Sequence, residues 1–138
     1  MINLILITHG DLAQSLVKTA LSITGGEETG IFAFSRTGRI DPDQLTADVK
    51  NALAQGKDGT IVLSDLFGGS CTNMCAVIID KNSNAVLISG ANLNMVITFL
   101  HNRDKLDLNA LAQKIEDDGK RGIININRFM NDAAAGGK

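Results

Sequence analysis

Residues 2–10 read INLILITHG, and this stretch decides the fold class of the chain. Ile2–Ile7 is a short, almost wholly apolar run, which is typical of a strand buried on both faces of a parallel sheet. Gly10 and Asp11 then open a run whose apolar residues recur at helical spacing. His9 therefore lies where a strand ends and a helix begins, and open α/β folds bind their ligands along that edge of the sheet.

The same alternation of short apolar runs and longer helical patterns continues along the chain. Further strands are expected at Gly30–Phe34, Thr60–Leu63, Ala85–Ser89 and Gly122–Ile126, and helices at about 12–23, 42–55, 70–79, 93–101 and 108–118. This order predicts an α/β fold with a mainly parallel open sheet and helices on both faces. With 138 residues, we expect a single domain over residues 1–130, followed by a flexible tail over 131–138.

Two helices carry clear end signals. Asp41 can cap the second helix, Pro42 suits its first position, and Gln44 would complete a capping box. Gly56 lies just beyond the last periodic residue of that helix and is expected to end it. Gly119 is expected to close the fifth helix in the same way.

The last expected strand, Gly122–Ile126, alternates apolar and polar residues more than the others do. Such a pattern suits a strand at the edge of the sheet or one exchanged between subunits. Because an exposed strand edge offers unpaired backbone groups, it invites pairing with another subunit. We therefore expect a dimer.

The composition excludes several classes of function. The formal net charge is −2 and Trp and Tyr are absent, so the chain lacks the basic surface and aromatic platforms of a nucleic-acid binder. No apolar run approaches the roughly 20 residues of a membrane helix, and the N-terminal segment lacks the features of a signal peptide, so a cytoplasmic protein is expected. Cys71 and Cys75 lie four residues apart on an expected helix, which favours reduced core thiols. No metal site or other cofactor is expected.

A second polar loop follows the expected strand Thr60–Leu63 and begins with Asp65. The carboxyl ends of parallel strands meet at one edge, so Asp65 should lie near His9. A carboxylate that accepts a hydrogen bond from one ring nitrogen would leave the other nitrogen free to attack phosphorus. A structural histidine and an aspartate that caps a turn remain the alternatives.

The same loop contains Gly68, Gly69 and Ser70 at the expected start of a helix. Backbone N–H groups and the Ser70 hydroxyl could bind a phosphate there, although a plain turn with a serine cap is the alternative. Neither a Walker loop nor a dinucleotide fingerprint is present, which favours phosphate handled without a nucleotide. Phe67 is a large apolar residue in this glycine-rich loop, so it either docks a partner or folds back onto the core.

Taken together, these residues resemble the enzyme IIA components of the mannose class (the mannose/fructose/sorbose family) of the bacterial phosphoenolpyruvate-dependent sugar phosphotransferase system. The resemblance is carried by the strand that ends in Thr8-His9-Gly10, by Asp65–Ser70 with Asn73 following, by Gly90–Met95 and by the turn Gly119–Gly122. Many members carry Pro where this chain has Cys71 and Asn94, and neither change removes a chemical group that phosphoryl transfer needs.

The resemblance implies a phosphocarrier in sugar uptake. By matching position, His9 takes a phosphoryl group from phospho-HPr and passes it to an enzyme IIB partner, Asp65 is its carboxylate partner, Ser70 contacts phosphate, and Phe67 lies where partners dock. It further implies a homodimer with an exchanged C-terminal strand, and indirect association with membrane sugar permease subunits without membrane insertion. A regulatory domain that uses His9 phosphorylation as a signal is a second hypothesis. An anion-binding domain without a covalent intermediate is a third.

Overall fold

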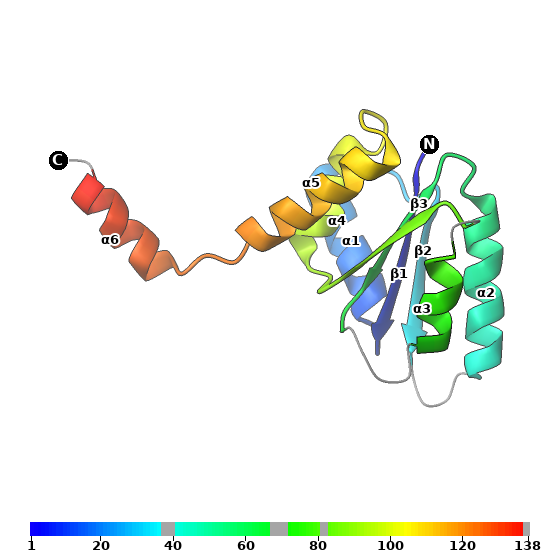
Figure 1. Cartoon of the computed structure of the whole chain (residues 1–138). Helices are drawn as coiled ribbons and strands as arrows, with labels where there is room; N and C mark the ends of the chain where they lie inside the picture. The colour runs from blue at the N-terminus through cyan, green and yellow to red at the C-terminus, as the bar shows by residue number, and fades with distance from the viewer. Residues whose placement is uncertain (37–40, 67–71, 81–82, 137–138) are drawn as a thin grey trace.

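The computed structural model describes residues 1–36, 41–66, 72–80 and 83–136, and Figure 1 shows their arrangement. Strands and helices alternate over most of this length. The strands are β1 (Asn3–His9), β2 (Ile31–Arg36), β3 (Thr60–Ser64) and β4 (Ala85–Ser89), and the helices are α1 (Leu12–Thr24), α2 (Pro42–Gln55), α3 (Thr72–Ile78), α4 (Leu93–Asn102), α5 (Leu108–Arg121) and α6 (Ile126–Gly136).

The four strands form one sheet in the order β2-β1-β3-β4, and every neighbouring pair is parallel. β1 lies inside the sheet, and its residues from Asn3 to Ile7 are buried, as expected from its apolar sequence. The pairing aligns His9 with Arg36 on β2 and Ile7 with Ser64 on β3. The predicted α/β fold with a parallel open sheet is therefore confirmed.

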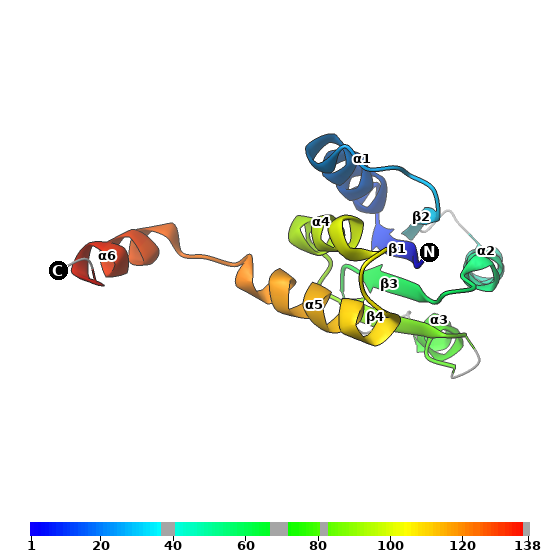
Figure 2. The ribbon, with the colours of Figure 1, turned by 90° about the horizontal axis from the view of Figure 1, so that it is seen from above.

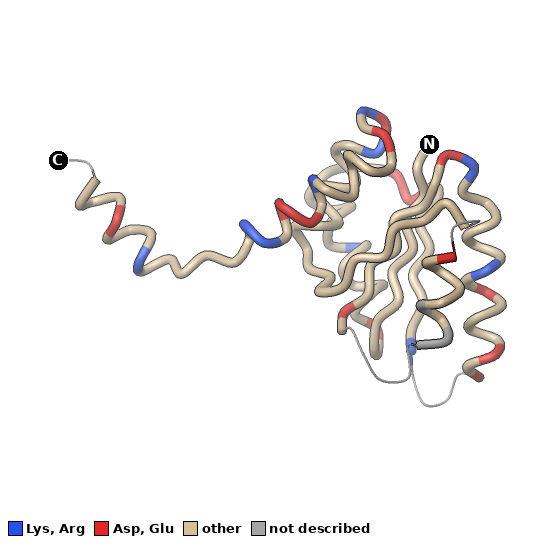
Figure 3. The backbone as a smooth tube through the Cα atoms, viewed as in Figure 1, with Lys and Arg blue, Asp and Glu red and all other residues tan. Residues whose placement is uncertain are grey.

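Helices cover both faces of the sheet (Figure 2). On one face, which we call the α1 face, Leu4 and Leu6 of β1 pack with α1, α4 and α5. On the other, the α2 face, Ile5 and Ile7 pack with α2 and α3. Alternate β1 side chains thus enter opposite cores, as the two-residue period of a strand requires. Acidic and basic positions both occur along helices α2 and α5 (Figure 3).

The ends of α2 agree with the sequence signals at three of four residues. The Asp41 carboxylate accepts a hydrogen bond from the Asp43 N–H at 3.0 Å, Pro42 is the first helical residue, and Gly56 ends the helix. The expected capping box is wrong, because the Gln44 amide donates to the Asp48 carboxylate at 2.9 Å. A side chain on the first turn meets its neighbour four residues ahead as readily as it reaches back to the cap.

Helix α5 does not end at Gly119, contrary to the sequence prediction, but continues to Arg121. Gly119 is buried, and a Cβ atom there would lie only 2.7 Å from Cγ of Met95 on α4. The glycine is therefore required by the close approach of two helices rather than by a helix end. A sequence pattern alone does not separate these two uses of glycine.

The fifth strand expected at Gly122–Ile126 does not form within the single chain. Residues 123–125 have no regular structure, and α6 begins at Ile126. This segment leads away from the sheet (Figure 1), so it has no strand of its own chain to pair with, and a strand requires such a partner. The tail expected over 131–138 overlaps α6, which is helical to Gly136 and contains no buried residue.

Within the described ranges of the chain, none of the helices combines the length and apolar character needed to cross a membrane.

Candidate functional site

The candidate site lies at the carboxyl ends of β1 and β3, which are neighbours in the sheet. The chain leaves β1 toward α1 on one face and leaves β3 toward α3 on the other. The edge between β1 and β3 is therefore a topological switch point, where the connections turn to opposite faces of the sheet. Such switch points are where open α/β folds bind their ligands.

His9 and Asp65 meet at this point. The Nδ1 atom of the His9 ring lies 2.8 Å from Oδ2 of Asp65, and the backbone N–H of His9 donates to the same oxygen at 2.9 Å. The His9 side chain is 57% exposed, whereas the Asp65 side chain is only 13% exposed. The structure thus brings together the two residues that the sequence analysis paired, with the ring open to solvent and its carboxylate partner sheltered.

The pKa of Asp65 lies below the usual value for a carboxyl group. Burial by itself would raise it, but hydrogen bonds from the His9 backbone N–H, the His9 ring and the Leu66 N–H, together with the charge of His9, outweigh that effect. The Leu66 N–H donates to Oδ1 at 2.8 Å, so both carboxylate oxygens have partners. Asp65 is therefore ionised at neutral pH.

The ionised Asp65 carboxylate determines the form of the His9 ring. A carboxylate can only accept hydrogen bonds, so Nδ1 of the neutral ring carries the hydrogen and Nε2 has a free lone pair. Any positive charge that develops on the ring is stabilised by the same carboxylate. The arrangement can therefore support nucleophilic attack by Nε2.

Thr8 and Gly10 hold His9 in this position. Thr8 is fully buried, and its hydroxyl accepts a hydrogen bond from the Ala13 N–H at 2.7 Å, which caps the start of α1. Asp11, the residue at the N-cap position, makes no such side-chain bond. Gly10 has φ +55°, a conformation that favours glycine and that turns the chain from strand to helix. Sequence reasoning missed the role of Thr8, although a threonine just before a helical pattern is the relevant signal.

The other proposed site residues, Phe67, Gly68, Gly69 and Ser70, lie outside the described residues. Their roles stay predictions. Cys71 lies outside them as well, so its departure from the usual proline has no structural account.

Two further motifs of the resemblance pack on each other. In Gly90–Met95, the Asn92 side chain accepts from the Met95 N–H at 3.1 Å and caps α4, while its amide donates to the Gly119 carbonyl at 3.4 Å. In Gly119–Gly122, a side chain at Gly122 would collide with Asn94. The late glycine turn therefore fits against the loop that follows β4.

Arg36 is a residue that sequence reasoning missed. The apolar pattern ended the second strand at Phe34, but β2 continues through Ser35 to Arg36, which pairs in register with His9. The relevant signal was the position of Arg36 in the sequence. Extending the expected strand by two residues places this basic residue at the same edge of the sheet as His9. In the described part of the chain, no three His, Cys, Asp or Glu residues lie close enough to hold a metal ion.

Comparisons with known proteins agree with this fold. Residues 3–116 match the model of the EIIA-man family, described as the PTS system fructose IIA component. A sorbose-specific EIIA component of the phosphotransferase system from Lacticaseibacillus casei is 25% identical over 114 residues, which cover 82% of each chain.

Two solved structures have a similar fold. One is phosphotransferase system component EIIA from Streptococcus agalactiae, with a TM-score of 0.83 and 19% identity, covering 93% of this chain and 99% of that one. The other is a mannose/sorbose-specific IIA subunit from Enterococcus faecalis, with a TM-score of 0.76 and 23% identity, covering 89% and 92%. The family match spans well over half of the chain, so the protein belongs to the EIIA-man family and is a mannose-class IIA component of the sugar phosphotransferase system.

Proposed function

We propose that His9 accepts a phosphoryl group from phospho-HPr and passes it to an enzyme IIB partner during sugar uptake. The observation that carries this proposal is the pairing of an exposed His9 ring with a sheltered, ionised Asp65. That pairing leaves Nε2 as the free nucleophile at an edge of the sheet that a partner protein can reach.

The transfer needs no group beyond those of the two proteins. The Nε2 lone pair of His9 forms the new bond to phosphorus while the bond from phosphorus to the donor histidine nitrogen breaks, and the donor ring leaves with its electron pair. Nδ1 of His9 keeps its proton, and the positive charge that the ring gains is stabilised by Asp65. Phosphoryl transfer of this kind passes through a loose transition state, so positioning and electrostatics supply most of the catalysis.

The loop after β3 completes the proposed site. We assign the Gly68 and Gly69 backbone N–H groups and the Ser70 hydroxyl to the phosphoryl oxygens, and Phe67 to partner docking. Support comes from the topology, because this loop directly follows Asp65 and Leu66 in the chain and Asp65 contacts His9. Docking of HPr and IIB in turn at this edge, in the cytoplasm, gives only indirect contact with membrane sugar permease subunits.

The function is tested by incubating the protein with phosphoenolpyruvate, enzyme I and HPr, followed by intact-mass analysis under non-acidic conditions. The expected result is a gain of one phosphoryl group that requires HPr, and NMR of the product should place it on Nε2 rather than Nδ1. Addition of IIB should then remove it. The proposal is wrong if the mass does not change while the same HPr phosphorylates another acceptor.

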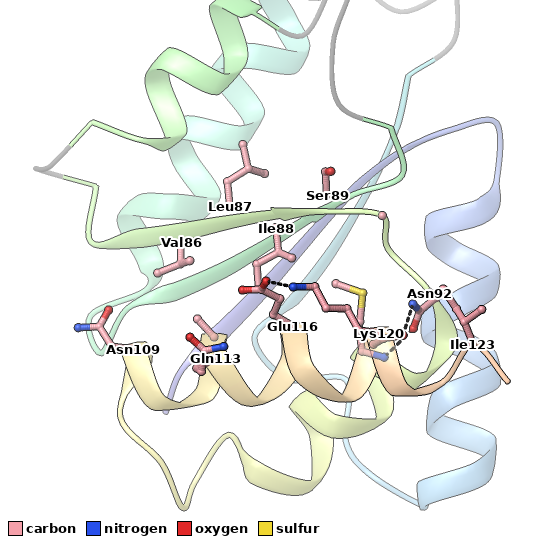
Figure 4. A pocket seen from close by; sticks show the side chains of 14 residues that line it. Val86, Leu87, Ile88, Ser89, Asn92, Asn109, Gln113, Glu116, Lys120 and Ile123 are labelled. Atoms are coloured by element: carbon pink, nitrogen blue, oxygen red, sulfur yellow. Dashed lines mark hydrogen bonds and ion pairs between the residues drawn. The ribbon is translucent and has the colours of Figure 1, made fainter.

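We further propose that the chain forms a homodimer through the open edge of β4. In the described sheet β4 pairs with β3 alone, and a groove of about 720 Å³ runs between β4 and α5. Val86 and Ile88 point toward α5 in this groove, and Ile123 lies at its end (Figure 4). A second copy can supply residues 122–126 as a partner strand, because Ile123, Ile124 and Ile126 are exposed in the single chain.

Light scattering tests the dimer. We expect twice the chain mass for the wild type, and a rise of at least roughly tenfold in the dissociation constant for Ile124→Asp, since a charge would enter the apolar contact. Ile79→Asp is the matched control, because Ile79 is similarly exposed but lies beyond α3. A wild-type protein that is monomeric at working concentrations would contradict the proposal.

A further inference from the structure

A basic residue ends the strand next to His9. Arg36 is the last residue of β2, and its Cα pairs in register with that of His9 on β1. Neighbouring strands lie about 4.8 Å apart, a spacing that an arginine side chain can easily span. The arrowheads of β1 and β2 lie side by side at the same edge of the sheet (Figure 1).

Arg36 and His9 belong to the same face of the sheet. Phe32 and Phe34 of β2 pack into the α2-face core together with Ile5 and Ile7 of β1. Because side chains alternate along a strand, the next residues in each series are Arg36 and His9.

The residue between Phe34 and Arg36 supports this alternation. Ser35 faces α1 on the opposite side, where its hydroxyl hydrogen-bonds the Gln14 side chain with an Nε2–Oγ distance of 3.0 Å. The strand therefore keeps its two-residue period to its last residues, and Arg36 belongs to the series of the two phenylalanines.

The order of the strands places His9 between two opposite charges. Asp65 follows β3 on one side of β1, and Arg36 ends β2 on the other. Asp65 holds Nδ1 of the ring, so Nε2 is the nitrogen that remains to carry a phosphoryl group.

A phosphoryl group on His9 would be stabilised by such a cation. It would bring negative charge next to the ionised Asp65 and close to Asp11, the second residue after His9. A guanidinium group offers several N–H donors in a planar fork that fits phosphoryl oxygens, and its charge offsets this repulsion. Arg36 is half-buried, so its charge is less screened than that of a fully exposed side chain.

We propose that Arg36 binds the oxygens of the phosphoryl group carried by His9 and stabilises them in the transition state of transfer. This inference rests on the proposed function. It adds a phosphate-binding side chain from β2 to a site otherwise built from the loops after β1 and β3.

The test is the rate of phosphorylation by phospho-HPr in Arg36→Ala, Arg36→Lys and Lys50→Ala. Removal of a charged donor to a transferring group should lower the rate for Arg36→Ala by roughly 10²-fold. Arg36→Lys should recover part of the rate, because lysine keeps the charge but not the fork. Lys50→Ala removes one positive charge from the exposed side of α2 and should transfer at the wild-type rate.

Added guanidinium ion at millimolar concentration should restore part of the rate of Arg36→Ala, which a merely structural role would not allow. The inference is overturned if Arg36→Ala folds and accepts phosphate at the wild-type rate, or if Lys50→Ala is slowed equally. Should Arg36→Ala fail to fold, equal rates for Arg36→Lys and the wild type overturn it. A wild type that gains no phosphoryl group would instead refute the proposed function itself, and this inference with it.

Discussion

Replacement of His9 by alanine should abolish the gain of a phosphoryl group from phospho-HPr, to below detection by intact-mass analysis. The variant loses Nε2, the nucleophile that the pairing with Asp65 leaves free. The chain contains only two histidines, so His101→Ala is a matched control. His101 lies on the last turn of α4, and its variant should gain one phosphoryl group as the wild type does.

The folded state should survive the His9 replacement, because the ring is more than half exposed and its backbone bond to Asp65 remains available. Circular dichroism and thermal unfolding can verify this. A phosphoryl gain by a folded His9→Ala protein would contradict the assignment of His9 as acceptor, and peptide mapping would then locate the true site.

Replacement of Asp65 by asparagine should slow phosphoryl transfer by roughly 10²–10⁴-fold. A neutral amide cannot stabilise the charge that the ring gains, and its NH2 group can favour the wrong ring tautomer. The loss should be in the maximal rate rather than in the HPr concentration at half-maximal rate, since Asp65 is sheltered from partners. Asp104→Asn is the control, because Asp104 is an exposed carboxylate after α4. An unchanged rate in Asp65→Asn would refute the orienting role.

The same carboxylate has a defined effect on stability against pH. The pKa of Asp65 is lowered in the folded protein from the ordinary value of 3.8, so its ionised form favours folding. That contribution is fully present above the ordinary value and is lost as the pH falls through the lowered one. The free energy of unfolding of the wild type should therefore fall more between neutral and acidic pH than that of Asp65→Asn, which lacks this carboxyl group. Urea unfolding at several pH values measures the difference.

The sequence predicted the elements that are buried within one chain. β1 was recognisable because a strand covered on both faces must be apolar throughout, and the core on each face contains its alternate residues. The strand predicted at Gly122–Ile126 is absent from the single chain because this segment leads away from the sheet and has no strand of its own chain to pair with. No local sequence pattern describes that missing partner. The prediction that Gly119 ends α5 was wrong because a helix end and a close contact between helices both favour glycine.

The candidate site was predictable where topology alone fixed it. His9 and Asp65 could be paired because both follow apolar strands, and parallel strands bring such residues to one edge. The place of Arg36 in the site was missed because the end of β2 is set by its pairing with β1 and not by the apolar pattern of β2 itself. The role of Thr8 was missed because, in the sequence, a threonine whose hydroxyl caps a helix looks the same as any other threonine in a strand.

One carboxylate oxygen of Asp65 holds both the backbone and the ring of His9. The histidine is thereby tied at two points to the residue that follows β3, which holds its ring in one orientation. Under the proposed function, HPr and IIB must both approach the same nitrogen of His9 from the same direction, so their binding surfaces overlap. They exclude one another, and HPr has to depart before IIB can arrive. The two transfers therefore occur in sequence. An excess of dephosphorylated HPr should slow the second transfer, because it competes with IIB for the same surface.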